Sequence, residues 1–118
     1  MENNKIPASE MLILNQLVTL TEQGIASRIL AKTSGGNLTL FAFDKGQALS
    51  EHSAPFDALV MVLEGKLALT IGGKQIYAVP GSIVLMPANI PHALEAIQVT
   101  RMLLVMLRET KVTSNSLD

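Results

Sequence analysis

Short segments in which hydrophobic residues alternate with polar ones, or run together, follow one another along most of the chain. From Gly24 onward, turn-forming residues separate these segments, and helix signals are nearly absent. The segments with strand character are residues 25–31, 38–43, 58–63, 67–71, 75–79, 83–86, 92–97 and 101–107. Short strands at regular spacing with little helix predict an all-β fold, either a sandwich or a closed barrel.

The residues between these segments have the chemistry of tight turns. Gly72-Gly73 suits a two-residue hairpin, because both central positions of a type I′ turn need positive φ. Pro80-Gly81 suits a turn in which proline presets φ at the second position and glycine accepts the third. The Ser34-Gly35-Gly36-Asn37 stretch is also expected to be a hairpin turn rather than a phosphate-binding loop.

Two strand segments, residues 58–63 and 102–107, are apolar at both parities. A strand that faces the core on one side and water on the other alternates, so these two strands are predicted to be covered on both faces. In a barrel the outer cover must come from a terminal segment, here residues 11–20, or from another subunit. The chain is 48% hydrophobic with a mean hydropathy of +0.36, which is apolar for 118 residues. We therefore expect a homodimer.

The chain is about one domain long and shows no repeat or linker that divides it. We assign residues 1–23 to a partly ordered N-terminal arm that could pack in a dimer, 24–108 to a barrel, and 109–118 to a disordered tail. Within the arm, residues 11–18 could form a helical turn or an edge strand, and periodicity does not decide between them.

Composition narrows the function classes. A net charge of −1 without a basic stripe argues against nucleic-acid binding, and no apolar run approaches the ~20 residues that a membrane helix needs. The absence of cysteine excludes disulfides and thiolate catalysis. The first five residues lack the features of a secretory signal, so we expect a cytoplasmic protein.

Both histidines of the chain fall into spaced motifs, Gly46-x5-His52-x12-Gly65 and Gly81-x5-Pro87-x4-His92. These motifs resemble the two signatures of the cupin superfamily, G-x5-H-x-H-x3-E-x6-G and G-x5-P-x-G-x2-H-x3-N. The resemblance covers roughly residues 24–107 and implies a small, single-domain cupin of the RmlC-like, conserved-barrel type. Its fold would be a jelly-roll barrel, or double-stranded β-helix, with little helix. Four signature positions differ in this chain: Ala54, Ala58, Asn89 and Ala96.

In the cupins that the chain resembles, three histidines and a carboxylate hold a divalent transition metal such as iron, manganese, nickel, copper or zinc. This chain retains only His52 and His92 of that set. Pro55 is expected to bend or interrupt the first motif strand, so Asp57 could turn inward and complete a site of two histidines and one carboxylate.

Two functions follow as hypotheses. The first is a small-molecule-binding protein with an apolar cavity in which the two imidazoles are the polar groups. The residues expected to line this cavity are His52, His92, Phe41, Phe43 and Phe56. The alternative is a metal-dependent enzyme of the dioxygenase, isomerase or lyase type, with His52, His92 and either Asp57 or water as metal ligands. The resemblance also implies self-association, because many small cupins dimerise through a sheet face.

Overall fold

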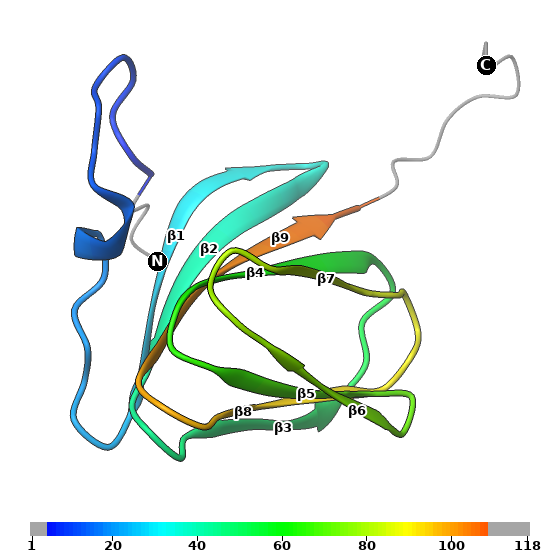
Figure 1. Cartoon of the computed structure of the whole chain (residues 1–118). Helices are drawn as coiled ribbons and strands as arrows, with labels where there is room; N and C mark the ends of the chain where they lie inside the picture. Colours follow the sequence, from blue (N-terminus) through cyan, green and yellow to red (C-terminus); the bar gives the residue numbers. More distant parts are fainter. Residues whose placement is uncertain (1–4, 109–118) are drawn as a thin grey trace, which may run out of the picture.

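The computed structural model describes residues 5–108. Within this range nine strands form two antiparallel sheets that face each other, as Figure 1 shows. One sheet has five strands in the order β1-β2-β9-β4-β7, and the other has four in the order β3-β8-β5-β6. The strands are β1 (Ile25–Thr33), β2 (Gly36–Phe43), β3 (Ala48–His52), β4 (Asp57–Glu64), β5 (Leu67–Ile71), β6 (Lys74–Ala78), β7 (Ile83–Met86), β8 (His92–Ala96) and β9 (Thr100–Leu107). The predicted all-β jelly roll is confirmed.

Local sequence explains most of these elements. At the turn between β5 and β6, Gly72 and Gly73 have φ values of 56° and 85°, as the predicted hairpin requires. Gly65, between β4 and β5, has a φ of 89°, and an added Cβ would lie 2.1 Å from the carbonyl oxygen of Val99. Only glycine fits there. Alternation did not predict β3, and residues 14–16 of the arm form a single 3-10 turn.

The main core lies between the two sheets. On β4 the inward residues are Ala58, Val60 and Val62, all buried, which gives the strand an alternating inner face. The other buried side chains of this core are Phe43, Leu67, Leu69, Ala78, Met86, Leu94, Ala96 and Met102. Aliphatic residues and methionine therefore form an interior that contains one fully buried aromatic ring.

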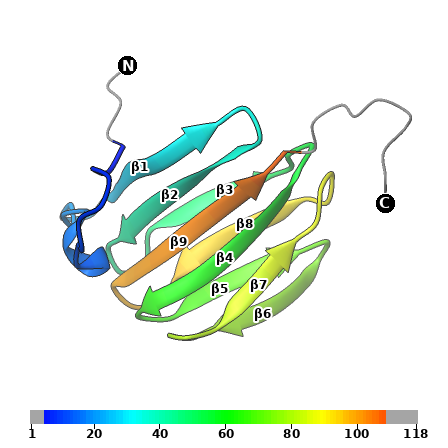
Figure 2. The ribbon, with the colours of Figure 1, turned by 90° about the horizontal axis from the view of Figure 1, so that it is seen from above.

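A second, smaller core lies on the outer face of the five-stranded sheet. Buried Val18 of the arm packs with Leu30, Leu40 and Ala42, as one cluster. Two arginines hold the arm: the Arg101 guanidinium donates a 3.5 Å hydrogen bond to the Val18 carbonyl, and the Arg28 guanidinium donates a 3.3 Å hydrogen bond to the Leu17 carbonyl. Figure 2 shows the arm at one side of this sheet, with β9, β4 and β7 beyond it. Cover by the N-terminal segment, one of the two predicted possibilities, is thus present at this end of the sheet.

Strand β1 lies at the edge of the five-stranded sheet and carries a β-bulge. Its register to β2 shifts between Ile29 and Ala31, and Leu30 between them is buried. The Leu30 carbonyl accepts a 3.0 Å hydrogen bond from the Ile6 backbone N–H. The arm therefore supplies a backbone partner to the edge strand at its irregular point.

Two further predictions concern the ends of the chain and the membrane. No helix in residues 5–108 is long and apolar enough to cross a membrane. The predicted tail, residues 109–118, lies outside the described residues, as does the start of the arm.

Candidate functional site

The structure brings the two histidines together at one end of the four-stranded sheet. His52 ends β3 and His92 begins β8, and these residues are direct partners across the antiparallel pair. The centroids of their rings are 4.5 Å apart, with the ring planes at 72°. A register shift between Leu49 and His52 precedes this pairing, so a local bulge sets the orientation of the first histidine.

The two rings lie in different surroundings. His92 is only 5% exposed and shares the inner face of β8 with Leu94 and Ala96, which belong to the main core. His52 is exposed. The cross-strand partner of His92 on β5 is half-buried Ile71. The pair therefore extends from the apolar interior to solvent.

Backbone carbonyls fix the tautomer of both rings. The Nδ1 atom of His52 lies 2.8 Å from the Ser50 carbonyl oxygen, and that of His92 lies 3.2 Å from the Ile90 carbonyl oxygen. A carbonyl oxygen only accepts, so we assign the hydrogen of each neutral ring to Nδ1. Each Nε2 atom then carries a lone pair that can accept a hydrogen bond or bind a metal.

Burial also favours the neutral form of the inner ring. The pKa of His92 is lowered from 6.5, first because the ring is desolvated and second because His52 lies beside it, and these effects outweigh the hydrogen bond to Ile90. The neutral form of His92 is therefore favoured at pH 7, and its Nε2 lone pair can accept a hydrogen bond.

The loop before β8 places His92. Asn89 in this loop has a φ of 65°, and its backbone N–H donates a 2.7 Å hydrogen bond to the Ala54 carbonyl. This is the position where the cupin signature has glycine. Asparagine is among the few other residues that adopt positive φ readily, so the backbone geometry of the motif is kept despite the substitution.

Asp57 has a structural role. Its Oδ1 atom accepts a 2.8 Å hydrogen bond from the Ala88 backbone N–H, which ties the start of β4 to the same loop. Among the described residues no three His, Cys, Asp or Glu side chains form a group that could hold a metal ion. The structure thus does not bring Asp57 into a three-ligand set with the two histidines, and offers a metal ion two imidazoles.

The three phenylalanines are divided between the core and the rim. Phe43 is fully buried in the main core, and Phe41 packs on it with ring centroids 6.0 Å apart. The guanidinium of Arg108 lies over the Phe56 ring, 5.4 Å from the centroid of that ring. Phe56 lines a separate cavity of about 330 Å³ together with Pro55, Asp57, Ala88, Leu107 and Arg108. Phe41 and Phe43 therefore belong with the packing of the barrel, and Phe56 with its rim.

The chain is similar to a known protein family and to several solved structures. The cupin domain family matches residues 39–107, which include both histidines. A conserved protein of unknown function from Streptococcus pyogenes is 35% identical, with a TM-score of 0.86, over 94% of this chain and 97% of that chain. A cupin superfamily protein from Desulfitobacterium hafniense is 27% identical, with a TM-score of 0.84, over 92% of this chain and 100% of that chain.

A third solved structure is the cupin 2 conserved barrel domain protein from Leptotrichia buccalis. It is 36% identical, with a TM-score of 0.77, over 80% of this chain and 46% of that chain. A comparison with curated proteins finds no match. The family match covers more than half of the chain, and the chain belongs to the cupin domain family.

Proposed function

We propose that this cupin binds a small molecule at the His52–His92 pair. The observation that carries the proposal is the pair itself, with both Nδ1 atoms engaged by carbonyls and both Nε2 atoms left with lone pairs. The barrel holds one ring against its core and the other in solvent. A ligand that reaches the pair from the exposed side, where His52 lies, therefore meets two acceptors at fixed positions.

The chemistry of the pair selects the kind of ligand. The Nε2 lone pairs of two imidazoles accept hydrogen bonds from hydroxyl or N–H groups. The neighbouring half-buried Ile71, together with the core beneath His92, provides apolar contact. A small molecule with an apolar body and a donor at one end suits such a site, as is usual for small-molecule pockets.

A metal-dependent enzyme is the second candidate. Metal-binding histidines commonly donate their other ring N–H to a carbonyl, which orients the ring, and both histidines here do so. A divalent transition metal held by the two Nε2 atoms would complete its coordination with water or substrate and would supply Lewis-acid chemistry. The two proposals differ in whether the ion is needed.

Metal content and ligand binding separate these proposals. The protein is purified without a histidine tag or added metal, and metal per subunit is measured by elemental analysis. Melting temperature is then measured with monosaccharides, aromatic diols and hydroxy acids as probes. We expect less than stoichiometric metal and a rise in melting temperature with at least one probe class. This rise should be lost in His52→Ala, whose ring is exposed, and kept in Glu95→Gln, which changes an outward side chain of β8.

Other results would contradict the binding proposal. Near-stoichiometric metal that disappears in both His52→Ala and His92→Asn would favour the enzyme. A probe-induced rise that persists in both histidine variants would place the binding site elsewhere. The cytoplasmic location stays a prediction.

A further inference from the structure

A cavity at the rim of the barrel is lined by two side chains of opposite charge. Its volume is about 330 Å³, and its lining residues are Pro55, Phe56, Asp57, Ala88, Leu107 and Arg108. They lie at the start of β4, at the end of β9 and in the loops that adjoin these strands and β7. None of the lining residues belongs to the four-stranded sheet, in which His52 and His92 pair. We call this separate site the rim cavity.

The two charged groups of the rim cavity do not neutralise each other. Among the described residues no ion pair joins Asp57 to Arg108. The Oδ1 atom of Asp57 accepts the hydrogen bond from the Ala88 N–H, which leaves the Oδ2 atom for a ligand. Within residues 5–108 the Arg108 guanidinium contacts the Phe56 ring and donates no hydrogen bond, so its N–H groups can also bind a ligand.

Backbone hydrogen bonds hold the main chain at both charges. The Arg108 backbone N–H donates a 2.7 Å hydrogen bond to the Gly35 carbonyl. Asp57 pairs with Leu107 at the start of β4, and its carboxylate is tied to the neighbouring loop at Ala88. A ligand that engages both groups therefore meets a site whose main chain is already ordered, which lowers the entropic cost of binding.

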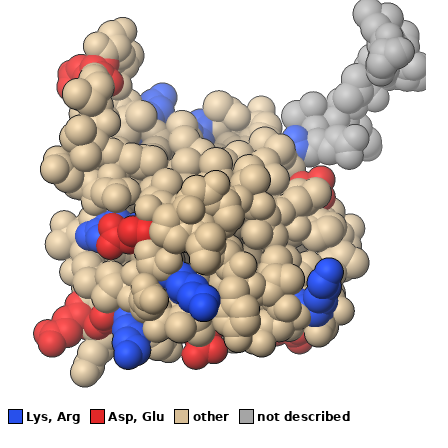
Figure 3. Space-filling view, in the orientation of Figure 1, with Lys and Arg blue, Asp and Glu red and all other residues tan. Residues whose placement is uncertain are grey.

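We propose that the rim cavity binds a zwitterion, namely a free α-amino acid with an aliphatic side chain. A simple anion would be repelled by the Asp57 carboxylate, and a simple cation by the Arg108 guanidinium. The carboxylate of an amino acid can accept two parallel N–H groups from the guanidinium, while its ammonium donates to Asp57. Figure 3 shows the charges of the displayed face scattered singly, and the net charge is −1, so no strong field of one sign opposes a neutral ligand.

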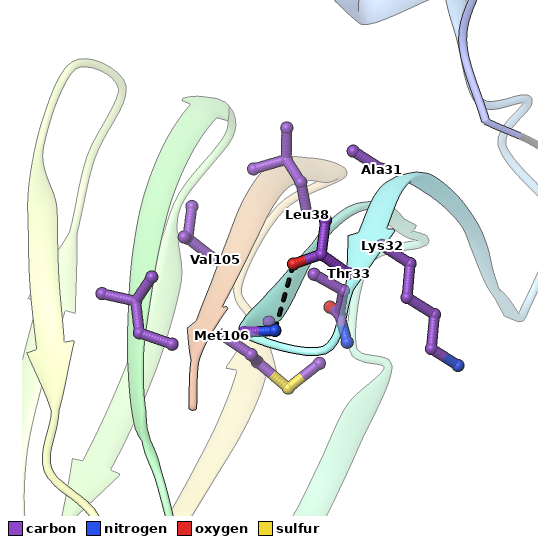
Figure 4. Close-up of a pocket in the computed structure, with 10 residues that line it drawn as sticks. Ala31, Lys32, Thr33, Leu38, Val105 and Met106 are labelled. Atoms are coloured by element: carbon purple, nitrogen blue, oxygen red, sulfur yellow. Dashed lines mark hydrogen bonds between the residues drawn. The ribbon is translucent and has the colours of Figure 1, made fainter. Parts of the chain in front are cut away.

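Apolar residues in the same wall suit an aliphatic side chain. Phe56 and Leu107 line the rim cavity, and Leu107 is 50% exposed. Leu107 also lines an open groove of about 300 Å³ at the β1–β2 hairpin, beside which Figure 4 shows Leu38 and Val105. An aliphatic side chain that covers Leu107 removes hydrocarbon of both partners from water. The apolar contact therefore favours leucine over alanine as a ligand.

Matched ligands test the need for both charges. Isothermal titration calorimetry compares L-leucine with 4-methylpentanoate, which lacks the ammonium, and with 3-methylbutylamine, which lacks the carboxylate. We expect a Kd of about 1 mM or less for L-leucine. Each analogue with one charge should bind about 10-fold more weakly, and L-alanine at least about 5-fold more weakly. The amide resonance of Ala88, whose N–H bonds Asp57, should shift when L-leucine is added.

Variants test the two residues. Asp57→Asn removes the charge but keeps an oxygen that can accept from Ala88, and Arg108→Gln removes the guanidinium. Each should weaken L-leucine binding about 10-fold. The matched control, Lys74→Gln/Glu95→Gln, removes one exposed charge of each sign from the four-stranded sheet and should bind like the parent. Circular dichroism checks that the variants fold.

His52→Ala should also bind L-leucine like the parent, which keeps this test independent of ligand binding at the histidine pair. No L-leucine binding at about 10 mM would overturn the proposal. So would an analogue with one charge that binds as tightly as L-leucine, because the cavity would then recognise a simple ion. Unchanged binding in either Asp57→Asn or Arg108→Gln, or a loss in His52→Ala, would also contradict the assignment.

Discussion

The two sheets have similar inner faces and different outer faces. On the five-stranded sheet the outward side chains of β4, Leu59 and Met61, are aliphatic, as are their partners on β9. On the four-stranded sheet one outer row joins Ala48, Glu95, Ala68 and Tyr77, and the next includes Ala93, Thr70 and Gln75. These outer positions are thus small or polar on the four-stranded sheet, and large and aliphatic on β4 and β9 of the five-stranded sheet.

This difference shows what alternation along a strand records. Strands β5 and β8 need burial on one face only, so their outer positions are free to be small or polar. On the outer faces of β4 and β9, Leu63 and Leu103 pack in the cluster that contains the arm, so this part of both strands is buried on both sides. The pattern along one strand therefore reports the number of layers around it.

The largest expected effect comes from removing a buried side chain beneath the arm, on the outer face of the five-stranded sheet. Leu40→Ala should lower the free energy of unfolding by about 2–5 kcal/mol, because Leu40 is fully buried although it points away from the main core. Thr70→Ala, on the outer face of the other sheet, should cost less than about 1 kcal/mol. Urea unfolding at one fixed protein concentration measures both. Equal losses would mean that the two outer faces are equivalent.

A smaller effect is expected from Arg101, one of the two arginines that hold the arm. Arg101 donates to the Glu64 carboxylate at 3.0 Å and to the Val18 carbonyl, and its side chain is only 18% exposed. Arg101→Gln should therefore lower the free energy of unfolding by about 1–2 kcal/mol. Lys66→Gln, which removes a cation over the Tyr77 ring on the other sheet, should cost about 0.5 kcal/mol or less.

Limited proteolysis provides the second readout for this pair. We expect the arm to be cleaved faster in Arg101→Gln than in the parent, and at the parent rate in Lys66→Gln. If cleavage in Arg101→Gln is no faster, the arginine does not secure the arm.

The smallest expected effect is on the pH dependence of the free energy of unfolding, and it compares the two faces of β8. Because the pKa of folded His92 lies below 6.5, the unfolded chain binds this proton first as the pH falls. The stability that depends on neutral His92 is therefore complete above pH 6.5, and decreases below it until the pH passes the lowered pKa. His92→Asn should flatten this part of the stability curve, measured by urea unfolding at several pH values. Glu95→Gln, outward on the same strand, should keep the slope; a slope retained in His92→Asn would assign it to another group.

Most of the fold could be predicted from the sequence because the physical causes are local. Gly72 and Gly73 have positive φ because a two-residue hairpin turn requires it at both positions. The eight predicted segments overlap eight of the nine described strands. Strand β3 was missed by alternation, since Ser50, Glu51 and His52 are all exposed beside half-buried Leu49. Such a strand is held by its partner β8 rather than by burial of alternate residues.

The candidate site could be predicted only in part. The resemblance to the cupin motifs implied that His52 and His92 would meet, but the carbonyls of Ser50 and Ile90 that fix their tautomers leave no trace in the side-chain sequence. The expectation for Asp57 rested on a bend at Pro55. It could not include the Ala88 N–H, which comes from a loop 31 residues later and engages this carboxylate.

The hydrogen bond from Ile6 to the bulged strand β1 has a consequence for the behaviour of the protein at high concentration. An open edge strand of nine residues is a template onto which a strand from another molecule can add, and such addition leads to fibres. The bulge at Leu30 breaks the regular ladder, and the arm occupies the carbonyl that lies there. The N-terminal arm therefore hinders the addition of a foreign strand at this edge, and it also covers part of the sheet.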